Sequence, residues 1–440
     1  MNPRTQIGPR VASCFVAGAI GISASPACGQ SSSPAIFVAN NGNLEGSISA
    51  LLVAPDGSLT FKQKIVTGSV PNSQQFHPGL NAYSISISPD GRFVAVGHAT
   101  ASQTVEQITI LEVFEDASIA IRKTFTTPDS PLDVEWIRDG LLAVTRTSFG
   151  GVNNVLVYAF DPSGPAGGRV TLVDSEVTGA FSSWIAVHPS RERISVQDST
   201  GTQISTFAVA ANGELEFLQS IDTGSTYPLG LGISPDGTWL YSGGGISSGG
   251  NAMQGWSIGD DGTLAPLDSS PFVSPGSSPK QLVVAGSGAF AYAAHGTDAT
   301  IRGFALDGIT GALTDIGVSF DVGFQGSLGE IIAKGTLLFA TDRDTLFDGV
   351  RGVYSFTVGE DGSLTQNGPL VDTQGIAPNS IAVWMPRSSL FADINGDGIV
   401  DGEDLGLLLS GWGSDAENLD LDANGVVDGG DLGMLLAKWS

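Results

Sequence analysis

A strand–turn–strand motif recurs along the middle of the chain at nearly constant spacing, and this repeat limits the fold more than any other feature. The clearest copy is SISISPDGRFVAV at residues 84–96, and LGLGISPDGTWLY at 229–241 repeats it. A second hairpin with an Asp-Gly or Asn-Gly turn lies between successive copies, as in ISALLVAPDGSLTF at 48–61. Each unit of about 50 residues therefore holds four strands, which is the pattern of a β-propeller blade. The turn glycines, or the residues that replace them, fall at positions 91, 140, 191, 237, 288 and 335.

The two ends of the repeat region predict how many blades there are and how the ring closes. The first unit begins at Ala35–Val38 without an opening strand, whereas a spare strand, Ser380–Trp384, follows the last unit. Pairing these two segments would leave no sheet edge unpaired. Residues 34–384 divide into seven units of about 50 residues. We therefore predict an all-β fold, a seven-bladed β-propeller over 34–384.

Composition and charge agree with a folded chain and exclude some partners. The chain is 41% hydrophobic and 15% charged, which excludes a disordered protein. Nineteen Lys and Arg against 45 Asp and Glu give a net charge of −26. Such a surface repels phosphate backbones and anionic lipids, so we expect no nucleic-acid partner. Calcium binding, or solubility alone, explains the excess of acidic residues better than a nucleic-acid or anionic-lipid partner does.

The N-terminal segment has the features of an export signal. Arg4 and Arg10 precede an apolar run from Val11 to Ala24, and small residues suited to a signal peptidase follow, near Gly29. This run is too short to cross a membrane, so we predict a signal peptide at 1–29 and no transmembrane span. Both cysteines, Cys14 and Cys28, lie in the segment, so cleavage would leave a protein without disulfides. The expected location is secreted, extracellular or at the cell surface, and a lipoprotein attached through Cys28 is the alternative.

Two acidic loops near the C-terminus have the ligand spacing of calcium sites. Each has a glycine at position 6, a backbone carbonyl ligand at position 7, and side-chain oxygens at positions 1, 3, 5, 9 and 12. The second loop follows the first by 27 residues, and each continues into an apolar helix, expected at 405–412 and 432–439. We therefore predict two bound calcium ions. The ligands would be Asp393, Asn395, Asp397, Ile399, Asp401 and Asp404 in the first loop, and Asp420, Asp422, Asn424, Val426, Asp428 and Asp431 in the second.

Both parts of the chain resemble known families. The SPDG motifs and D-G-x-L hairpins over 34–384 resemble the lactonase family of seven-bladed propellers, to which 6-phosphogluconolactonase-type proteins belong. The duplicated loop and helix over 391–440 resemble a type I dockerin, with 385–390 as a linker. The first resemblance implies lactone or carbohydrate chemistry. The second implies calcium-dependent docking to a cohesin-like or cell-surface protein.

Polar residues after the second strand of each blade are the candidates for chemistry in the propeller. Symmetry places these positions together at one end of the central channel, where they could combine a general base with anion-binding groups. Such residues also cap strand ends in many propellers, which is the competing structural interpretation. Glu330 and Lys280, near the starts of the last two blades, are further candidates. The catalytic candidates are His98, Arg146, Asp198, His295, Asp342 and Arg343, with Asn40 and Gly243 at the equivalent positions.

The expected function is attachment of a binding or scaffolding propeller through a calcium-binding, dockerin-like tail. Lactonase-family members commonly have a Gly-Pro-Arg-His run before a central blade, whereas the matching stretch here, 181–184, reads FSSW. This difference favours binding, of a carbohydrate for example, over catalysis. The alternative is an extracellular hydrolase that acts on a lactone or carbohydrate in polysaccharide breakdown.

Overall fold

The computed structural model describes most of the propeller and parts of the C-terminal segment. The N-terminal segment with the predicted signal peptide lies outside the described residues. The described residues are 33–42, 45–69, 81–99, 106–148, 151–224, 228–244, 250–323, 327–343, 352–386, 392–395, 400–414, 416, 419–421, 426–436 and 438–439.

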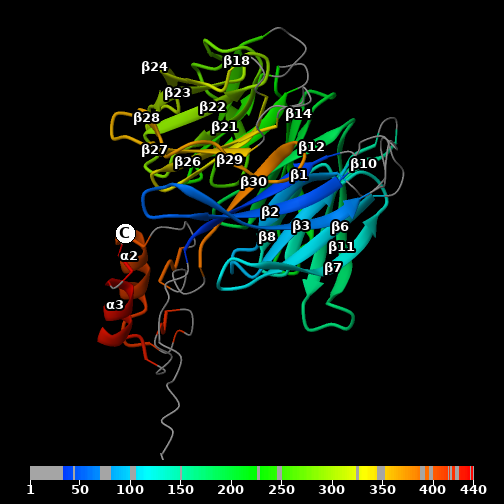
Figure 1. Cartoon of the computed structure of the whole chain (residues 1–440), viewed down its shortest axis with the longest axis vertical. Helices are drawn as coiled ribbons and strands as arrows, with labels where there is room; N and C mark the ends of the chain where they lie inside the picture. The colour runs from blue at the N-terminus through cyan, green and yellow to red at the C-terminus, as the bar shows by residue number, and fades with distance from the viewer. Residues whose placement is uncertain are drawn as a thin grey trace, which may run out of the picture. The chain divides into compact units, whose positions relative to one another are not determined.

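The described strands form seven antiparallel sheets, which confirms the seven-bladed propeller predicted from the repeat (Figure 1). Each blade is given from its inner to its outer strand. The first blade consists of β30 (Pro378–Trp384), β1 (Ala35–Asn41), β2 (Glu45–Val53) and β3 (Leu59–Ser69), and the second of β4 (Ala82–Ile87), β5 (Phe93–His98), β6 (Glu106–Val113) and β7 (Ile119–Thr127). The third consists of β8 (Val134–Arg138), β9 (Leu141–Arg146), β10 (Asn153–Asp161) and β11 (Arg169–Gly179).

The other four blades follow the same order, and two of them have a short additional strand. The fourth blade consists of β12 (Ser182–Val187), β13 (Arg193–Asp198), β14 (Gln203–Val209) and β15 (Leu215–Asp222), and the fifth of β16 (Leu229–Ile233), β17 (Trp239–Gly243), β18 (Ala252–Ile258), β19 (Leu264–Pro266) and β20 (Phe272–Val273). The sixth consists of β21 (Pro279–Val284), β22 (Phe290–His295), β23 (Thr300–Leu306) and β24 (Leu313–Asp321). The seventh consists of β25 (Leu328–Lys334), β26 (Leu337–Asp342), β27 (Gly352–Val358), β28 (Leu364–Gln366) and β29 (Val371–Asp372).

The ring closes through the pairing of the last strand with the first. β30 runs antiparallel to β1, with Ala35 opposite Trp384 and Asn40 opposite Pro378. Figure 1 shows β30, in orange, beside β1, in blue. The predicted pairing of Ser380–Trp384 with the start of the repeat region is therefore confirmed. Because β30 supplies the inner strand of the first blade, every blade has four main strands.

The SPDG motif forms a turn that is stabilised by hydrogen bonds from its own side chains. Ser88 Oγ accepts the N–H of Phe93 at 2.9 Å and donates to Asp90 Oδ1 at 2.6 Å. Asp90 Oδ1 also accepts the N–H of Arg92 at 2.9 Å. Gly91 has φ = 66°, a left-handed conformation that favours glycine. The same contacts recur at 234–239, which explains why this motif is the clearest trace of the repeat.

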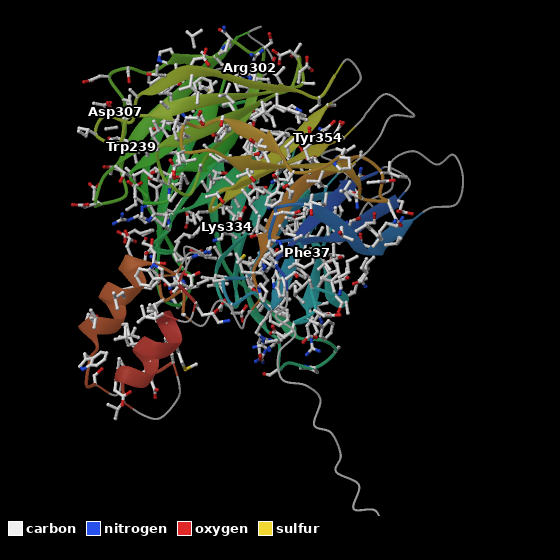
Figure 2. The ribbon with its side chains drawn as sticks, turned by 60° about the vertical axis from the view of Figure 1, so that its left-hand side comes forward. Phe37, Trp239, Arg302, Asp307, Lys334 and Tyr354 are labelled. Carbon is white, nitrogen blue, oxygen red and sulfur yellow. The ribbon has the colours of Figure 1, made fainter. Side chains whose placement is uncertain are left out.

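Apolar side chains fill the space between neighbouring blades. Phe37 (Figure 2) and Trp384 are almost fully buried in a cluster that also contains residues of β4 and β5. Hydrogen bonds between blades repeat as well, since the hydroxyls of Tyr241 and Tyr292 each donate, at 2.8 Å, to a carbonyl 70 residues further along. The core is therefore distributed around the ring.

The C-terminal segment forms two short helices, α2 (Gly402–Ser410) and α3 (Gly429–Leu436). Each begins three residues before the helix expected from the sequence and ends earlier than expected. The cause in α2 is the N-cap residue Asp401, whose carboxylate accepts the N–H of Glu403 at 2.8 Å. Asp428 accepts the N–H of Gly430 at 2.7 Å in the same way. No described helix is long and apolar enough to cross a membrane.

The two halves of this segment are equivalent in their packing as well as in sequence. Its buried residues come in pairs 27 positions apart, and they form one small cluster. The structure therefore describes a duplicated loop-and-helix unit with a shared core. The assignment of this unit as a dockerin-like calcium-binding domain stays a prediction. The paired core residues are Ala392 and Leu419, Val400 and Val427, and Leu408 and Leu435.

Candidate functional site

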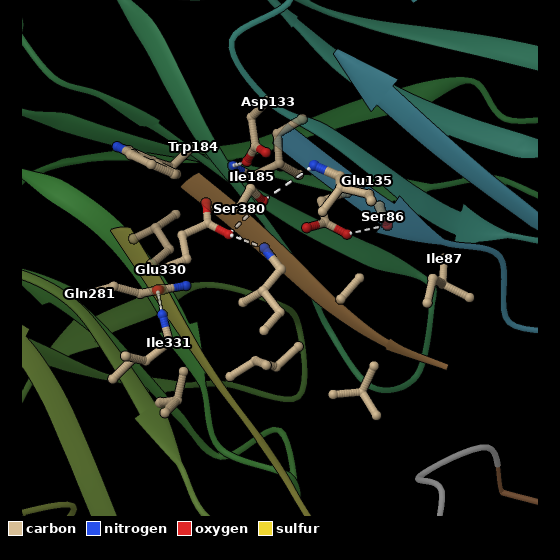
Figure 3. A pocket seen from close by; sticks show the side chains of 17 residues that line it. Ser86, Ile87, Asp133, Glu135, Trp184, Ile185, Gln281, Glu330, Ile331 and Ser380 are labelled. Carbon is tan, nitrogen blue, oxygen red and sulfur yellow. Dashed lines mark hydrogen bonds between the residues drawn. The ribbon is translucent and has the colours of Figure 1, made fainter. Parts of the chain in front are cut away.

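A cavity of about 340 Å³ lies where the inner strands of the blades meet. Its wall is largely aliphatic, with isoleucines contributed by several blades. Trp184 of β12 also lines it, as do three acidic side chains: Asp133, which directly precedes β8, Glu135 of β8 and Glu330 of β25 (Figure 3). Among the described residues that line the cavity, none is a lysine or an arginine. A concave pocket with apolar residues and a few converging polar groups is the usual form of a small-molecule site.

Polar side chains around the cavity connect several inner strands to the next blade. An inner strand is an edge strand, so some of its buried N–H groups need partners other than a neighbouring strand. Five side chains supply them: Ser86 Oγ accepts the N–H of Trp136 at 3.1 Å, and the donors to the other four occupy corresponding positions in their blades. The bonds run from the N–H of Ile85 to Ser380 Oγ (3.2 Å), of Ile185 to Asp133 Oδ2 (2.7 Å), of Ile331 to Gln281 Oε1 (2.9 Å) and of Ile381 to Glu330 Oε2 (3.3 Å).

Burial raises the pKa of all three carboxyl groups. It raises the pKa of Glu330 to about 7, although hydrogen bonds from Ser380 and Ile381 and the charge of Arg343 lower it. It also raises the pKa of Glu135 to about 7, where the hydrogen bond from Ser86 opposes the rise and the charge of Glu330 adds to it. The pKa of Asp133 lies well above its usual value because of burial first and the Glu135 charge second.

Two of the acids have one oxygen each that no described residue engages. Glu135 Oε2 accepts from Ser86 Oγ at 2.7 Å, and Glu330 Oε2 accepts from Ser380 Oγ at 2.5 Å. Neither Oε1 atom has a hydrogen-bond partner among the described residues, and the same holds for Nε2 of Gln281. The cavity thus offers two carboxyl groups that titrate near neutral pH and one amide donor, a set suited to general acid–base chemistry.

The candidates predicted from the sequence lie at one edge of the ring, which we call the start edge because the inner strands begin there. His98, Asp198, His295 and Asp342 each end a second strand and pair with the first residues of an inner strand, or close to them. Arg146 ends β9, Asn40 lies in β1, and Gly243 ends β17. None of these residues lines the cavity. The candidate residues therefore lie at one end of the ring, as predicted, but other side chains form the cavity.

Contacts at the start edge are mostly local to one blade. His98 Nε2 lies 3.0 Å from Thr109 Oγ1, and Arg146 Nε donates to Asp129 Oδ2 at 2.7 Å. His295 Nε2 lies 2.7 Å from Ser274 Oγ, and burial lowers the pKa of its imidazole. Strand capping accounts for these contacts, and a catalytic role of these residues stays a prediction. Asp198 Oδ1 accepts the N–H groups of Phe181, Thr200 and Gly201 (2.7–2.9 Å), and Asp342 Oδ1 accepts that of Ser327 (3.2 Å).

Sequence reasoning named Glu330 but missed the rest of the polar cavity wall. Asp133 and Glu135 stand in LDVEWIR, where most other blades have small, amide or apolar residues and the seventh has Glu330 in the place of Asp133. A pair of acids at alternate positions of an inner strand is the signal that could have identified them, because both then face the channel. Gln281 could have been found in the same way, as the polar residue that corresponds to Asp133 in its blade.

Part of each predicted calcium loop lies among the described residues. The last predicted ligand of each loop, Asp404 or Asp431, is fully buried and accepts backbone N–H groups of its own loop. Among the described residues, no group of three or more His, Cys, Asp or Glu side chains is placed to hold a metal ion. The predicted ligands Asp397, Ile399, Asp422 and Asn424 lie outside the described residues.

Comparison with known proteins gives structural likeness without sequence likeness. No protein-family model matches the chain, and no curated protein matches it. A putative 6-phosphogluconolactonase from Bacteroides fragilis superposes with a TM-score of 0.62 at 17% identity, covering 82% of this chain and all of that one. A periplasmic gluconolactonase from Pseudomonas aeruginosa gives 0.60 at 17% identity, covering 80% and 99% of the two chains. The putative 6-phosphogluconolactonase of Bacteroides uniformis gives 0.61 at 18% identity, with the same coverage. The chain thus has the seven-bladed β-propeller fold of 6-phosphogluconolactonase-like proteins.

Proposed function

We propose that the propeller hydrolyses a small, hydroxyl-rich lactone in its central cavity, with Glu330 as general base and Glu135 as general acid. The observation that supports this is the pair of glutamic acids with pKa values near 7 that line one cavity, each with one oxygen that accepts no hydrogen bond from a described residue. General acid–base catalysis is most effective when the pKa of the group lies near the working pH. The fold likeness to proteins described as lactonases agrees with this proposal.

Nearby charges favour this assignment of the two roles. The charge of Arg343 lowers the pKa of Glu330, which favours its carboxylate form. The charge of Glu330 in turn raises the pKa of Glu135, which favours its protonated form, although the charge of Arg191 lowers this pKa. Two carboxyl groups of one site whose environments act differently on their ionisation are the usual pattern of an acid–base pair.

The proposed reaction consumes one water and opens one ester bond. Glu330 takes a proton from water as the water oxygen bonds to the carbonyl carbon of the lactone, while Gln281 Nε2 donates to the developing oxyanion. The bond from that carbon to the ring oxygen then breaks, and Glu135 gives its proton to the departing oxygen. The product is a hydroxy acid. The proton gained by Glu330 returns to Glu135 through solvent, and ionisation of the product releases one proton.

Titration of released acid tests the activity directly. D-Glucono-1,5-lactone and an unsubstituted γ-lactone serve as substrates near pH 6.5, with spontaneous hydrolysis subtracted. We expect Glu330→Gln and Glu135→Gln to lower kcat by about 100-fold or more. Glu216→Gln, on the exposed outer strand β15, is the matched control and should leave the rate unchanged. Absence of hydrolysis by the wild type, or full activity of the double variant, would contradict the proposal.

For the C-terminal unit we propose calcium-dependent attachment of an exported propeller to a cohesin-like or cell-surface protein. The packing of its two halves supports the proposal, because residues 27 positions apart occupy equivalent places. Carboxylate, amide and carbonyl oxygens are the ligands that calcium prefers, and the predicted loops supply these. Apolar side chains remain exposed at equivalent positions of both halves, and such residues suit a protein contact. They are Leu409 and Leu436, and Trp412 and Trp439.

A pull-down from the native extracellular fraction tests this attachment, with the full chain as bait. Calcium in one sample and a chelator in the other separate specific capture from background. We expect a partner that is retained with calcium and released by the chelator. The variant Trp412→Ser/Trp439→Ser should lose the partner while still binding calcium. Equal capture with and without calcium would contradict the proposal.

A further inference from the structure

The ionisable side chains of the cavity wall are all acidic, and most of the remaining wall is aliphatic. Asp133, Glu135 and Glu330 line the cavity together with isoleucine, leucine and valine side chains from inner strands of several blades. None of the three carboxyl groups forms an ion pair with a described residue. A ligand in this cavity therefore meets hydrocarbon over most of its surface and carboxyl groups at a few points.

Two of the three carboxyl groups are only partly satisfied by the protein. Glu135 and Glu330 each accept a serine hydroxyl through Oε2, and Oε1 of each has no hydrogen-bond partner among the described residues. Asp133 differs, because Oδ1 accepts the N–H of Val134 at 3.0 Å and Oδ2 accepts that of Ile185 at 2.7 Å. The two glutamic acids thus retain one oxygen each for a donor on a ligand, whereas Asp133 adds charge at a fixed position.

One short segment of β4 holds these two glutamic acids near each other. Ser380 Oγ donates to Glu330 Oε2 and accepts the N–H of Ile85 at 3.2 Å. Ser86, the next residue, donates to Glu135 Oε2 at 2.7 Å. Figure 3 shows both glutamic acids with their serine partners at the cavity. Each carboxyl group is therefore connected through one serine hydroxyl to one of two consecutive residues of the same strand.

An aromatic ring lies on the same wall. Trp184 lines the cavity and directly precedes Ile185, whose N–H donates to Asp133 Oδ2 (Figure 3). The face of an indole ring attracts an ammonium ion through the negative charge of its π system. Carboxylates attract the same ion and donate nothing to an anion. The polar part of the wall therefore favours a cation over an anion.

We propose that the cavity binds an organic ammonium ion, whose N–H groups pair with the carboxylates of Glu135 and Glu330 and whose aliphatic body lies against the isoleucines of the wall. We call this the cation site. It goes beyond the proposed hydrolysis and does not depend on it. An ammonium ion would supply the counter-ion that both buried carboxylates lack, and hydrogen bonds between two charged groups are stronger than neutral ones. Trp184 would add a cation–π contact.

Ionisation of the two glutamic acids should control binding at the cation site. Burial is the main cause that raises both pKa values to about 7, while the charge of Arg191 lowers that of Glu135 and the charge of Arg343 lowers that of Glu330. Neither arginine lines the cavity. The charges of both glutamates, after burial, raise the pKa of Asp133. A bound cation favours the ionised form of each acid, so the affinity should be highest above pH 7.

Calorimetric titration of the full chain at pH 8 tests the cation site with three probes that share one ring. Cyclohexylammonium is the cation, cyclohexanol is the neutral probe and cyclohexanecarboxylate is the anion. We expect the ammonium ion to bind about tenfold or more tightly than the alcohol, and the carboxylate to bind more weakly than either. At pH 5, where the glutamic acids are protonated, the preference for the cation over the alcohol should be lost.

Variants locate the bound cation. Glu135→Gln and Glu330→Gln should each lower the affinity for cyclohexylammonium at pH 8 by about tenfold and leave that for cyclohexanol unchanged. Trp184→Leu keeps an apolar wall and should weaken the cation by about threefold or more. Glu216→Gln, on the exposed strand β15, removes a negative charge elsewhere and is the matched control. A melting curve by circular dichroism checks that each variant folds.

The outcomes separate the cation site from the proposed hydrolysis. Binding of cyclohexylammonium that depends on Glu135 and Glu330, without hydrolysis of any lactone, would support the cation site and overturn the proposed activity. Equal affinities for the three probes, or for the wild type and both glutamine variants, would overturn the cation site and leave the activity standing. If both proposals are correct, cyclohexylammonium should raise KM for the lactone and leave kcat unchanged, because one cavity holds both ligands.

Discussion

The indole Nε1 of Trp384 donates a hydrogen bond of 2.8 Å to the carbonyl of Gly91, 293 positions earlier in the chain. The donor lies at the end of β30, and the acceptor lies in the SPDG turn of the second blade. Trp384 is 1% exposed and packs against Phe37, with their ring centroids 6.4 Å apart. One side chain therefore joins the last inner strand both to its own blade and to the next.

Removal of the closing strand should unfold the propeller. A chain that ends after residue 377 lacks β30, which would leave the first blade without its inner strand and expose the apolar faces beside it. We expect this chain to lose the cooperative melting transition of the β signal in circular dichroism. A chain that ends after residue 386 keeps β30 and should retain the transition. Equal melting of the two chains would contradict closure through β30.

The variant Trp384→Phe tests the same closure by removing one hydrogen-bond donor, the indole N–H. The phenyl ring keeps most of the apolar contact but removes the donor to Gly91. We expect a loss of about 1–2 kcal/mol in the free energy of unfolding, since a buried carbonyl then lacks its partner. Urea denaturation measures this loss. Trp412→Phe, in the exposed part of the C-terminal unit, is the control and should leave propeller stability unchanged.

The propeller could be predicted from the sequence because its turns are chemically distinctive. Ser88, Asp90 and Gly91 have separate roles in one turn, so their spacing survives in other blades as a readable motif. Closure was predictable for a related reason, because a ring with a missing and a spare strand has one obvious pairing. The helix starts were misplaced because Asp401 was assigned only as a loop ligand, whereas its carboxylate also caps α2.

The cavity was harder to predict because its polar residues differ from blade to blade. The residues that correspond to Glu135 and Gln281 in most other blades are small or apolar, so no repeated motif marks them. Their importance depends on which side chains of different blades face one another, and this is a property of the closed ring. Polar strand ends such as His98 and Asp198 stand out in the sequence, yet their contacts satisfy neighbouring polar groups.

Stability should fall as the pH rises through the range in which the cavity acids titrate. Glu135 and Glu330 have folded pKa values of about 7, above the ordinary value of 4.5. Between these pH values the unfolded chain releases protons that the folded chain retains, so ionisation progressively favours unfolding. Below pH 4.5 this effect is absent, and above pH 7 it is fully developed.

The variants Glu135→Gln and Glu330→Gln should remove that dependence. Relative to the wild type, we expect each to gain about 1–3 kcal/mol in the free energy of unfolding at pH 8 and nothing at pH 4.5. Urea denaturation at both pH values measures the difference. Glu216→Gln, on an exposed strand, provides the control for loss of one negative charge. A gain at pH 4.5 that equals the gain at pH 8 would show that these groups are not buried acids with raised pKa values.

The hydrogen bond between Gln281 and Ile331 should stabilise the contact between the sixth and seventh blades. Gln281→Leu keeps the size of the side chain but leaves the buried N–H of Ile331 without its acceptor at 2.9 Å. We expect a cost of about 1–3 kcal/mol, measured by urea denaturation at pH 7. Val283→Leu, two residues along in the same strand, is the control for altered packing in the cavity. A neutral effect of Gln281→Leu would mean that water replaces the side chain as the acceptor.

Calcium should determine whether the C-terminal unit folds. Residues 391–440 contain 11 Asp and Glu and one Lys, so a net charge of −10 is concentrated in 50 residues. Its core consists of six buried residues and their neighbours, which is too small to oppose that repulsion alone. Calcium would neutralise the loops, and its binding free energy would then become folding free energy.

We expect calorimetry of the full chain to show two ions, with Asp393→Ala and Asp420→Ala each removing one. A chelator should decrease the helical signal while the β signal of the propeller persists. No calcium uptake, or a helical signal unchanged by chelator, would refute the predicted loops.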